Sequence, residues 1–271
     1  MSTMRVRELL HHACFALAIA ATVAVAPLGA QDDAATYIAR IEGKQTPDRQ
    51  GLDGYTVAEL LQRFRVPGIS VAVIKDFKIH WAKGYGVADV ETNRMVDTAT
   101  LFQAASISKP VTAFAAARLA QEGKFTFDTD VNQLLKSWKV PRNEKTGAQP
   151  VTLRSLFSHT SGSDDGFGFP GYAPNEPRPT LVQIFSGEKP SNVGAVTFTR
   201  PPYAAYKYSG GGLTILQLAL TDFTGMPFAD FMQRYALGPV GMGNSTYEQP
   251  ISGPLAARTS RAHGGNGRSM G

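Results

Sequence analysis

Cysteine is almost absent from the sequence. The single cysteine among its 271 residues, Cys14, lies in an apolar N-terminal segment that we expect to be removed from the mature protein. A chain without cysteine has no disulfide, no thiolate nucleophile and no cysteine-ligated metal. Histidine is also scarce, and the histidines outside that segment, His80, His159 and His263, show no metal-ligand spacing. We therefore expect no bound metal.

Dense runs of basic residues are absent too. The formal charge of +5 is mild, and no cluster of Lys and Arg accompanies it. Nucleic acid is therefore not an expected partner. The apolar fraction of 43% is large enough for a substantial core, and the length fits one large domain or two small ones.

The first 30 residues have the composition of a secretory signal peptide. Two arginines form a basic start, residues 13–26 are apolar except for one threonine, and the segment ends in the small residue Ala30. The apolar run is short for a membrane span. We expect residues 1–30 to be cleaved and residues 31–271 to form the folded domain. The mature protein would then be periplasmic or secreted, without a stable membrane span.

Two common functional motifs are missing or misplaced. No Gly-x-Ser-x-Gly occurs, so the nucleophile elbow of the α/β-hydrolases is absent. Residues 166–171 satisfy the spacing Gly-x-Gly-x-x-Gly, but no strand precedes them, no helix follows them, and a proline occupies the turn. We expect no dinucleotide site and no other cofactor.

The apolar periodicity predicts two strands followed by many short helices. A capping box at Thr56-Val-Ala-Glu59 opens a helix that ends before Pro67. Residues 68–75 and 78–87 are predicted strands, joined near Asp76-Phe77 in a hairpin whose turn lacks the usual glycine. Further helices are expected at residues 111–121, 131–135, 152–157 and 213–223, with a final one opened by Pro227. The pattern predicts an α+β fold, an antiparallel sheet with a helical subdomain.

Residues 163–202 show no periodicity and are rich in Gly and Pro. A segment of this length and composition is typical of a long ordered loop or lid rather than of a linker between domains. We expect it to form part of the substrate pocket.

The strongest chemical signal is the pair Ser106 and Lys109. A spacing of three places both side chains on one helical face, one turn apart. A serine needs a neighbouring base to become a nucleophile, and a lysine serves as that base when burial lowers its pKa. The apolar, Ala-rich residues 111–121 predict a buried helix behind the pair. Pro110 fits only in a first turn, which places Ser106 at the positive end of the helix dipole.

Two further choices stay open on chemistry alone. A Ser-His-Asp arrangement is an alternative, because His159 lies in the hydroxyl-rich loop 158–162. A phenol near a Ser–Lys pair can relay a proton to a leaving group, and three tyrosines compete for that role: Tyr203, Tyr206 and Tyr208.

The motif Ser106-Ile-Ser-Lys109, followed by Tyr208-Ser-Gly210, resembles the first two signatures of the serine β-lactamase and penicillin-binding protein superfamily. The chain is most similar to the class C β-lactamase-related serine hydrolases, which include esterases and D-amino-acid peptidases. The similarity runs in family order over residues 69–248. Supporting phrases are Gly84-Tyr-Gly-Val-Ala-Asp89, the segment 151–162, and Gly238-Pro-Val-Gly-Met242 with Ser245-Thr246 after it.

The resemblance implies a β-lactamase/transpeptidase-like fold and assigns the roles. Ser106 would be the acylated nucleophile, Lys109 its base and Tyr208 the proton relay. Family members split an ester, amide or lactam bond of a small molecule or peptide through a covalent acyl-enzyme. The backbone N–H of the nucleophile forms one half of the oxyanion hole. Gly210 stands in a substrate-binding position where the family often has asparagine.

The third family signature, a Lys or His followed by glycine on a strand, is not recognisable after Tyr208. Lys145-Thr-Gly147 spells it too early and in polar loop sequence, and residues 261–268 are the only late candidate. We therefore expect an incomplete domain that contains only the N-terminal strands of its sheet. Its hairpin would lack partner strands, so we expect poor folding and little activity. The alternative function is a non-catalytic binder of cell-wall peptide or glycan, or an inactive pseudo-hydrolase.

Overall fold

The computed structural model describes residues 34–43, 51–165, 171–172 and 175–270. The expected signal peptide lies outside these residues, and so does nearly all of the Gly-x-Gly-x-x-Gly segment. Within the described ranges, no helix is both long and apolar enough to cross a membrane.

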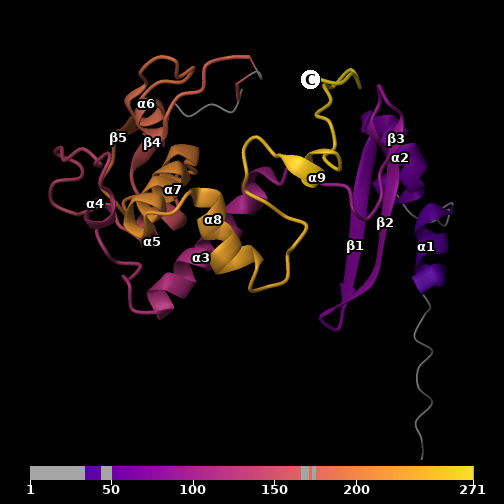
Figure 1. The fold of residues 1–271 in the computed structure, drawn as a ribbon, viewed down its shortest axis with the longest axis horizontal. Helices are drawn as coiled ribbons and strands as arrows, with labels where there is room; N and C mark the ends of the chain where they lie inside the picture. Colours follow the sequence, from indigo (N-terminus) through magenta and orange to yellow (C-terminus); the bar gives the residue numbers. More distant parts are fainter. Residues whose placement is uncertain (1–33, 44–50, 166–170, 173–174, 271) are drawn as a thin grey trace, which may run out of the picture.

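The chain forms two lobes, which lie side by side in Figure 1. The sheet lobe, residues 34–100, contains the strands β1 (Gly68–Lys75), β2 (Lys78–Asp89) and β3 (Arg94–Met95). Its helices are α1 (Ala34–Glu42) and α2 (Val57–Phe64), with the short turn η1 (Gly51–Gly54) between them. The helical lobe spans residues 101–247, and the C-terminal segment, residues 248–270, runs back between the two lobes.

The predicted hairpin is confirmed, and its backbone explains why it needs no glycine. Strands β1 and β2 are antiparallel, with Val71 opposite Lys83 and one register shift after Val73. Both turn residues adopt left-handed conformations, Asp76 at φ 51° and Phe77 at φ 58°. Two positive φ angles give the mirror-image turn whose twist matches that of the strands. The capping box at Thr56 is also present and opens α2.

The expectation of a hairpin without partners is wrong. Strand β3 pairs with β2, placing Met95 opposite Val87. The turn before β3 is closed by the Asp89 carboxylate, which accepts hydrogen bonds from the Glu91 N–H and the Thr92 hydroxyl, each at 2.9 Å. These polar residues fold the chain back locally, a signal that apolar periodicity does not carry.

The C-terminal segment ties the two lobes together. Leu101 bridges in parallel to Thr259. The Arg261 N–H donates to the Ala88 carbonyl at 2.8 Å. The Arg258 side chain donates to the Ala99 carbonyl at 2.9 Å. The short helix α9 (Gly253–Ala256), which the sequence analysis missed, lies just before these contacts.

The helical lobe is built around helix α7, which begins at Gly210, three residues earlier than predicted. Its side chains Ile215, Leu216, Ala219 and Leu220 are fully buried. The other elements, in chain order, are η2 (Ala105–Ile107), α3 (Ser108–Gln121), α4 (Val131–Leu134), α5 (Leu153–Phe157), β4 (Ser163–Asp165), α6 (Leu181–Ser186), β5 (Val196–Phe198), α8 (Phe228–Met232) and the π-helical turn η3 (Gln233–Leu237).

The prediction of a loop over residues 163–202 is wrong where the structure describes them. Strands β4 and β5 pair antiparallel, with Ser163 opposite Phe198, and α6 lies between them in the sequence. Helix α6 has a capping box, because the Thr180 hydroxyl and the Gln183 side chain each bind the other's backbone N–H. It ends at Gly187, whose φ of 67° is left-handed. Both signals are visible in the sequence, and the frequent Gly and Pro concealed them.

Candidate active site

The segment that carries Ser106 changes direction sharply at Ala105. Ala105 has a φ of 44°, in the left-handed region that favours glycine. A non-glycine residue held there costs about 1–3 kcal/mol, and the surrounding structure has to supply that energy. Helix α3 follows directly from Ser108, three residues before the predicted start at 111, and Pro110 lies in its first turn as predicted.

Ser106 and Lys109 are in contact. The Lys109 Nζ donates to the Ser106 Oγ at 2.8 Å. Ser106 is exposed and Lys109 is half-buried. The first backbone hydrogen bond of the turn runs from the Ile107 N–H to the Ala104 carbonyl at 3.0 Å. The N–H of Ser106 therefore precedes the hydrogen-bonded part of the helix, where backbone N–H groups point outward and favour negative charge.

Of the three tyrosines, Tyr208 is the one that contacts Ser106. The hydroxyls of Tyr208 and Ser106 share a hydrogen bond of 2.8 Å. The Lys109 Nζ lies 5.1 Å from the centre of the Tyr208 ring. Tyr203 instead hydrogen-bonds the Thr152 hydroxyl at 2.6 Å, and Tyr206 is 69% exposed. The side chains of Lys109 and Tyr208 thus converge on the Ser106 oxygen.

His159 is beside this group but does not bind the serine. Among the described residues, the Ser106 hydroxyl has hydrogen bonds with Lys109 and Tyr208. The His159 ring lies against Tyr208, with ring centres 4.4 Å apart and planes at 34°. The described residues therefore do not form a Ser-His-Asp arrangement around Ser106.

A chain of hydrogen-bonded, buried serine hydroxyls leads to Ser209, the residue after Tyr208. Ser161 and Ser163 hydrogen-bond at 2.8 Å, and Ser163 donates to Ser209 at 2.9 Å. The Ser209 hydroxyl accepts from the Gly212 N–H at 2.8 Å and so caps helix α7. All three serines are at most 2% exposed. The sequence analysis missed this network, and the cap position of Ser209 before a helix was the available signal.

Tyr247 supports the first turn of helix α3 in a similar way. Its hydroxyl donates to the Ser108 carbonyl at 2.8 Å. The Thr112 hydroxyl donates to the same oxygen at 3.0 Å. Burial raises the pKa of Tyr247, so the phenol stays protonated and remains a donor. No periodic pattern links residues so far apart, and the sequence analysis missed this contact.

The residue before Tyr208, Lys207, forms an ion pair. Lys207 binds the Asp164 carboxylate, and this hydrogen bond lowers the pKa of Asp164. The Asp164 carboxylate therefore stays charged near neutral pH, and its bond to Lys207 joins the segment before Tyr208 to strand β4.

The remaining sequence candidates lie elsewhere. Gly210 is buried in the first turn of α7, where its carbonyl accepts from the Thr214 hydroxyl at 3.1 Å; its role in substrate binding stays a prediction. Thr146 of the Lys-Thr-Gly sequence is buried in a turn and donates to the Pro141 carbonyl at 2.7 Å. His263 accepts from the Val90 N–H at 3.4 Å, on the sheet lobe.

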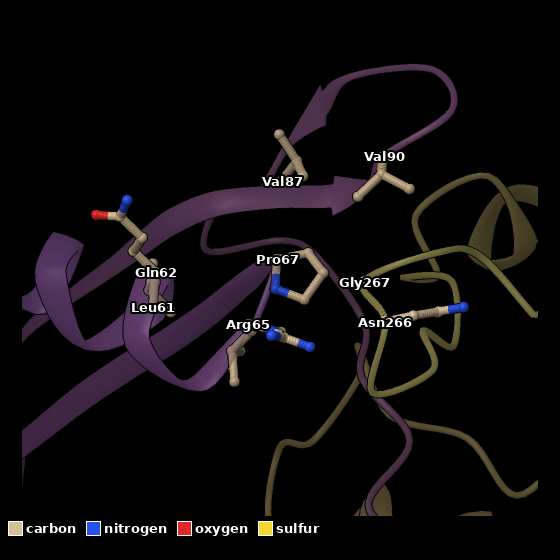
Figure 2. Close-up of a pocket in the computed structure, with 9 residues that line it drawn as sticks. Leu61, Gln62, Arg65, Pro67, Val87, Val90, Asn266 and Gly267 are labelled. Atoms are coloured by element: carbon tan, nitrogen blue, oxygen red, sulfur yellow. The ribbon is translucent and has the colours of Figure 1, made fainter.

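Figure 2 shows a shallow hollow of about 320 Å³ on the sheet lobe. It is bordered by the end of α2, by β2 and by the C-terminal segment, with Pro67, Val87, Val90 and Gly267 on its walls. None of the three converging side chains lines this hollow. In the described part of the chain, no group of three or more His, Cys, Asp or Glu residues could hold a metal ion.

Known proteins match both the sequence and the fold. A family model described as Beta-lactamase matches residues 55–270. The Unguisins hydrolase ungD' of Aspergillus campestris is 31% identical over 196 residues, which cover 70% of this chain and 35% of that protein.

Two solved structures illustrate the shared fold. The D-alanine carboxypeptidase AmpC from Burkholderia cenocepacia superimposes with a TM-score of 0.59 at 19% identity, covering 79% of this chain and 54% of that one. EstCE1, a hydrolase with promiscuous acyltransferase activity, gives a TM-score of 0.60 at 21% identity, covering 76% and 54%. The chain spans about a third of the length of the curated relatives it matches.

Proposed function

Because this chain belongs to the beta-lactamase family, we propose that it is a serine hydrolase that forms an acyl-enzyme on Ser106. The observation that carries the proposal is the pair of 2.8 Å contacts that Lys109 and Tyr208 make with the Ser106 oxygen. Such a nucleophile with two proton-transfer groups in contact is the arrangement that acyl transfer requires.

The reaction would proceed in two halves. The Ser106 Oγ attacks the substrate carbonyl carbon while its proton passes to the Lys109 side chain, which acts as the base. The N–H of Ser106 stabilises the negative charge that develops on the carbonyl oxygen. The Tyr208 hydroxyl delivers a proton to the leaving oxygen or nitrogen as its bond to carbon breaks. Water then attacks the ester on Ser106 and gives one proton to Tyr208. Lys109 returns its proton to the Ser106 oxygen as the bond to the acyl carbon breaks, which releases the acid and the free serine.

The proposed substrates carry an ester, amide or β-lactam bond, as for class C-related members of the family. One matched relative is itself named as a hydrolase, of unguisins, which supports hydrolysis in general without selecting among these bonds. Ser106 is exposed and Tyr208 is 43% exposed, so both side chains are accessible from solvent.

Labelling with a fluorescent fluorophosphonate, together with hydrolysis of p-nitrophenyl acetate, tests the proposal. Ser106→Ala should abolish both signals, while the neighbouring Ser108→Ala should keep them. Lys109→Ala and Tyr208→Phe should each lower turnover by about 10²–10⁴-fold, because each removes one proton-transfer group. Labelling that persists in Ser106→Ala would defeat the assignment, and ligand binding without any covalent mass gain would favour a non-catalytic binder.

We also propose that the protein is exported. The basic start and apolar run of residues 1–30 support this, with cleavage after Ala30. N-terminal sequencing of protein recovered from the periplasm or medium should begin at Gln31, and recovery of the uncleaved chain from the cytoplasm alone would contradict it.

A further inference from the structure

The proposed proton relay, Tyr208, and its two neighbours in the chain all contact His159. The Lys207 N–H donates to the His159 carbonyl at 2.8 Å. The Ser209 N–H donates to the His159 Nδ1 at 3.2 Å. Between these two bonds, the Tyr208 ring lies against the imidazole at 4.4 Å. One residue thus holds the backbone on both sides of Tyr208 and its ring as well.

His159 is itself held by the packed part of the helical lobe. Its N–H donates to the Leu156 carbonyl at 3.2 Å, and the next N–H, of Thr160, donates to the Ser155 carbonyl at 2.8 Å. Leu156 and Ser155 are at most 1% exposed. His159 has a φ of 57°, so its backbone is fixed in the left-handed region. These contacts give the imidazole a defined position relative to the core.

The bond from Ser209 also fixes the state of the imidazole. A ring nitrogen that accepts a hydrogen bond carries no proton, so the hydrogen of the neutral ring is on Nε2. A charged imidazolium, which has hydrogen on both nitrogens, could not accept the Ser209 N–H. The contact therefore requires a neutral ring whose Nδ1 lone pair accepts the Ser209 N–H.

We propose that His159 is the positioning residue for Tyr208: it holds the phenol at the Ser106 oxygen through the Ser209–Nδ1 hydrogen bond and the ring contact. This rests on the proposed function, in which Tyr208 relays the proton. His159 acts through Tyr208 and does not contact the reacting oxygen. The consequence is a role in the rate of proton transfer rather than in substrate binding.

Two substitutions separate the bond from the ring. His159→Asn keeps an acceptor near the Nδ1 position and tolerates the left-handed backbone, whereas His159→Phe keeps a ring and loses the acceptor. His159→Phe should lower kcat for p-nitrophenyl acetate by about 10- to 100-fold with KM nearly unchanged, because small misplacements of a catalytic group are costly. His159→Asn should recover much of that loss. His80→Asn, in strand β2 of the sheet lobe, serves as the matched control and should leave kcat unchanged.

The melting temperature of each variant shows whether it is folded, and ¹⁵N NMR of the histidine rings tests the contact without any mutation. A His159 signal of an unprotonated Nδ1 and a protonated Nε2 supports the proposal, and a protonated Nδ1 overturns it. A folded His159→Phe with the kcat of the wild type overturns it too, as does a change confined to KM. Failure of the proposed function looks different, because turnover then survives in Ser106→Ala.

Discussion

Two phenylalanines illustrate how differently the lobes are packed. Phe231 of the helical lobe is 0% exposed, whereas Phe77 at the tip of the sheet lobe is 103% exposed. The large hydrophobic cluster consists of residues between 115 and 236, all in the helical lobe. The sheet lobe contributes only Trp81, Ala88 and Val96 to the buried apolar residues of the described chain.

The proposed catalytic side chains follow the same division. Ser106, Lys109 and Tyr208 all belong to the helical lobe, and so do their supporting contacts from Ser163, Ser209 and Tyr247. The lobe that holds the core therefore also sets the geometry around Ser106. The C-terminal segment forms backbone hydrogen bonds with the helical lobe at Leu101 and with the sheet lobe at Ala88.

The largest expected difference is between the two phenylalanines. Phe231→Ala should lower the free energy of unfolding by about 3–5 kcal/mol, because it removes a fully buried ring and leaves a cavity. Phe77→Ala removes an exposed ring and should change it by less than about 0.5 kcal/mol. Urea unfolding followed by circular dichroism measures both. Equal losses for the two variants would show that the lobes do not differ in this way.

Ser163→Ala tests the network of buried serine hydroxyls that leads to Ser209, next to Tyr208. The substitution leaves the hydroxyls of Ser161 and Ser209 without this partner, so unfolding should become easier by about 1–3 kcal/mol. Fluorophosphonate labelling should slow as well, since Ser209 adjoins Tyr208. Ser70→Ala, at an exposed position of β1, is the control. A stable Ser163→Ala with unchanged labelling would separate the network from the site.

Tyr247→Phe removes only the hydroxyl that binds the Ser108 carbonyl. We expect a loss of about 0.5–1.5 kcal/mol in stability, the usual net value of one hydrogen bond. We also expect slower acylation, because the first turn of α3 carries Ser106 and Lys109. Tyr235→Phe is the control, since no hydrogen bond is formed by the Tyr235 hydroxyl in the described chain. Stopped-flow labelling that is equally fast in both variants would argue against a role for Tyr247.

The smallest effect concerns acid stability through Asp222. Burial raises the pKa of this carboxyl, but hydrogen bonds from the N–H groups of Lys136 and Ser137 outweigh burial and the pKa is lowered. A lowered folded pKa contributes stability above the unfolded pKa of about 3.9, and this is lost as pH falls through the folded value. The melting-temperature gap between wild type and Asp222→Asn should therefore be present at pH 7 and narrow below pH 4. A gap that widens on acidification would reverse the sign.

The sequence predicted what local chemistry determines. The Ser106–Lys109 contact follows from a spacing of three at a helix start, and the hairpin follows from two apolar runs with a short turn. Spacing alone could not link distant residues: the choice of Tyr208 over Tyr203 came from the family resemblance, and the structure adds its contact with Ser106. The prediction for residues 163–202 was wrong for a different reason. Gly and Pro suppressed the apolar periodicity there, although the capping box at Thr180 was present.

Peptide mapping by mass spectrometry, after the wild-type protein is acid-quenched during turnover of a slow ester, tests the central claim most directly. The account predicts one acyl group, attached to the peptide that contains Ser106, and no acyl group in Lys109→Ala on the same time scale. An acyl group on another serine, or turnover with no covalent intermediate in a chain that hydrolyses the ester, would contradict it.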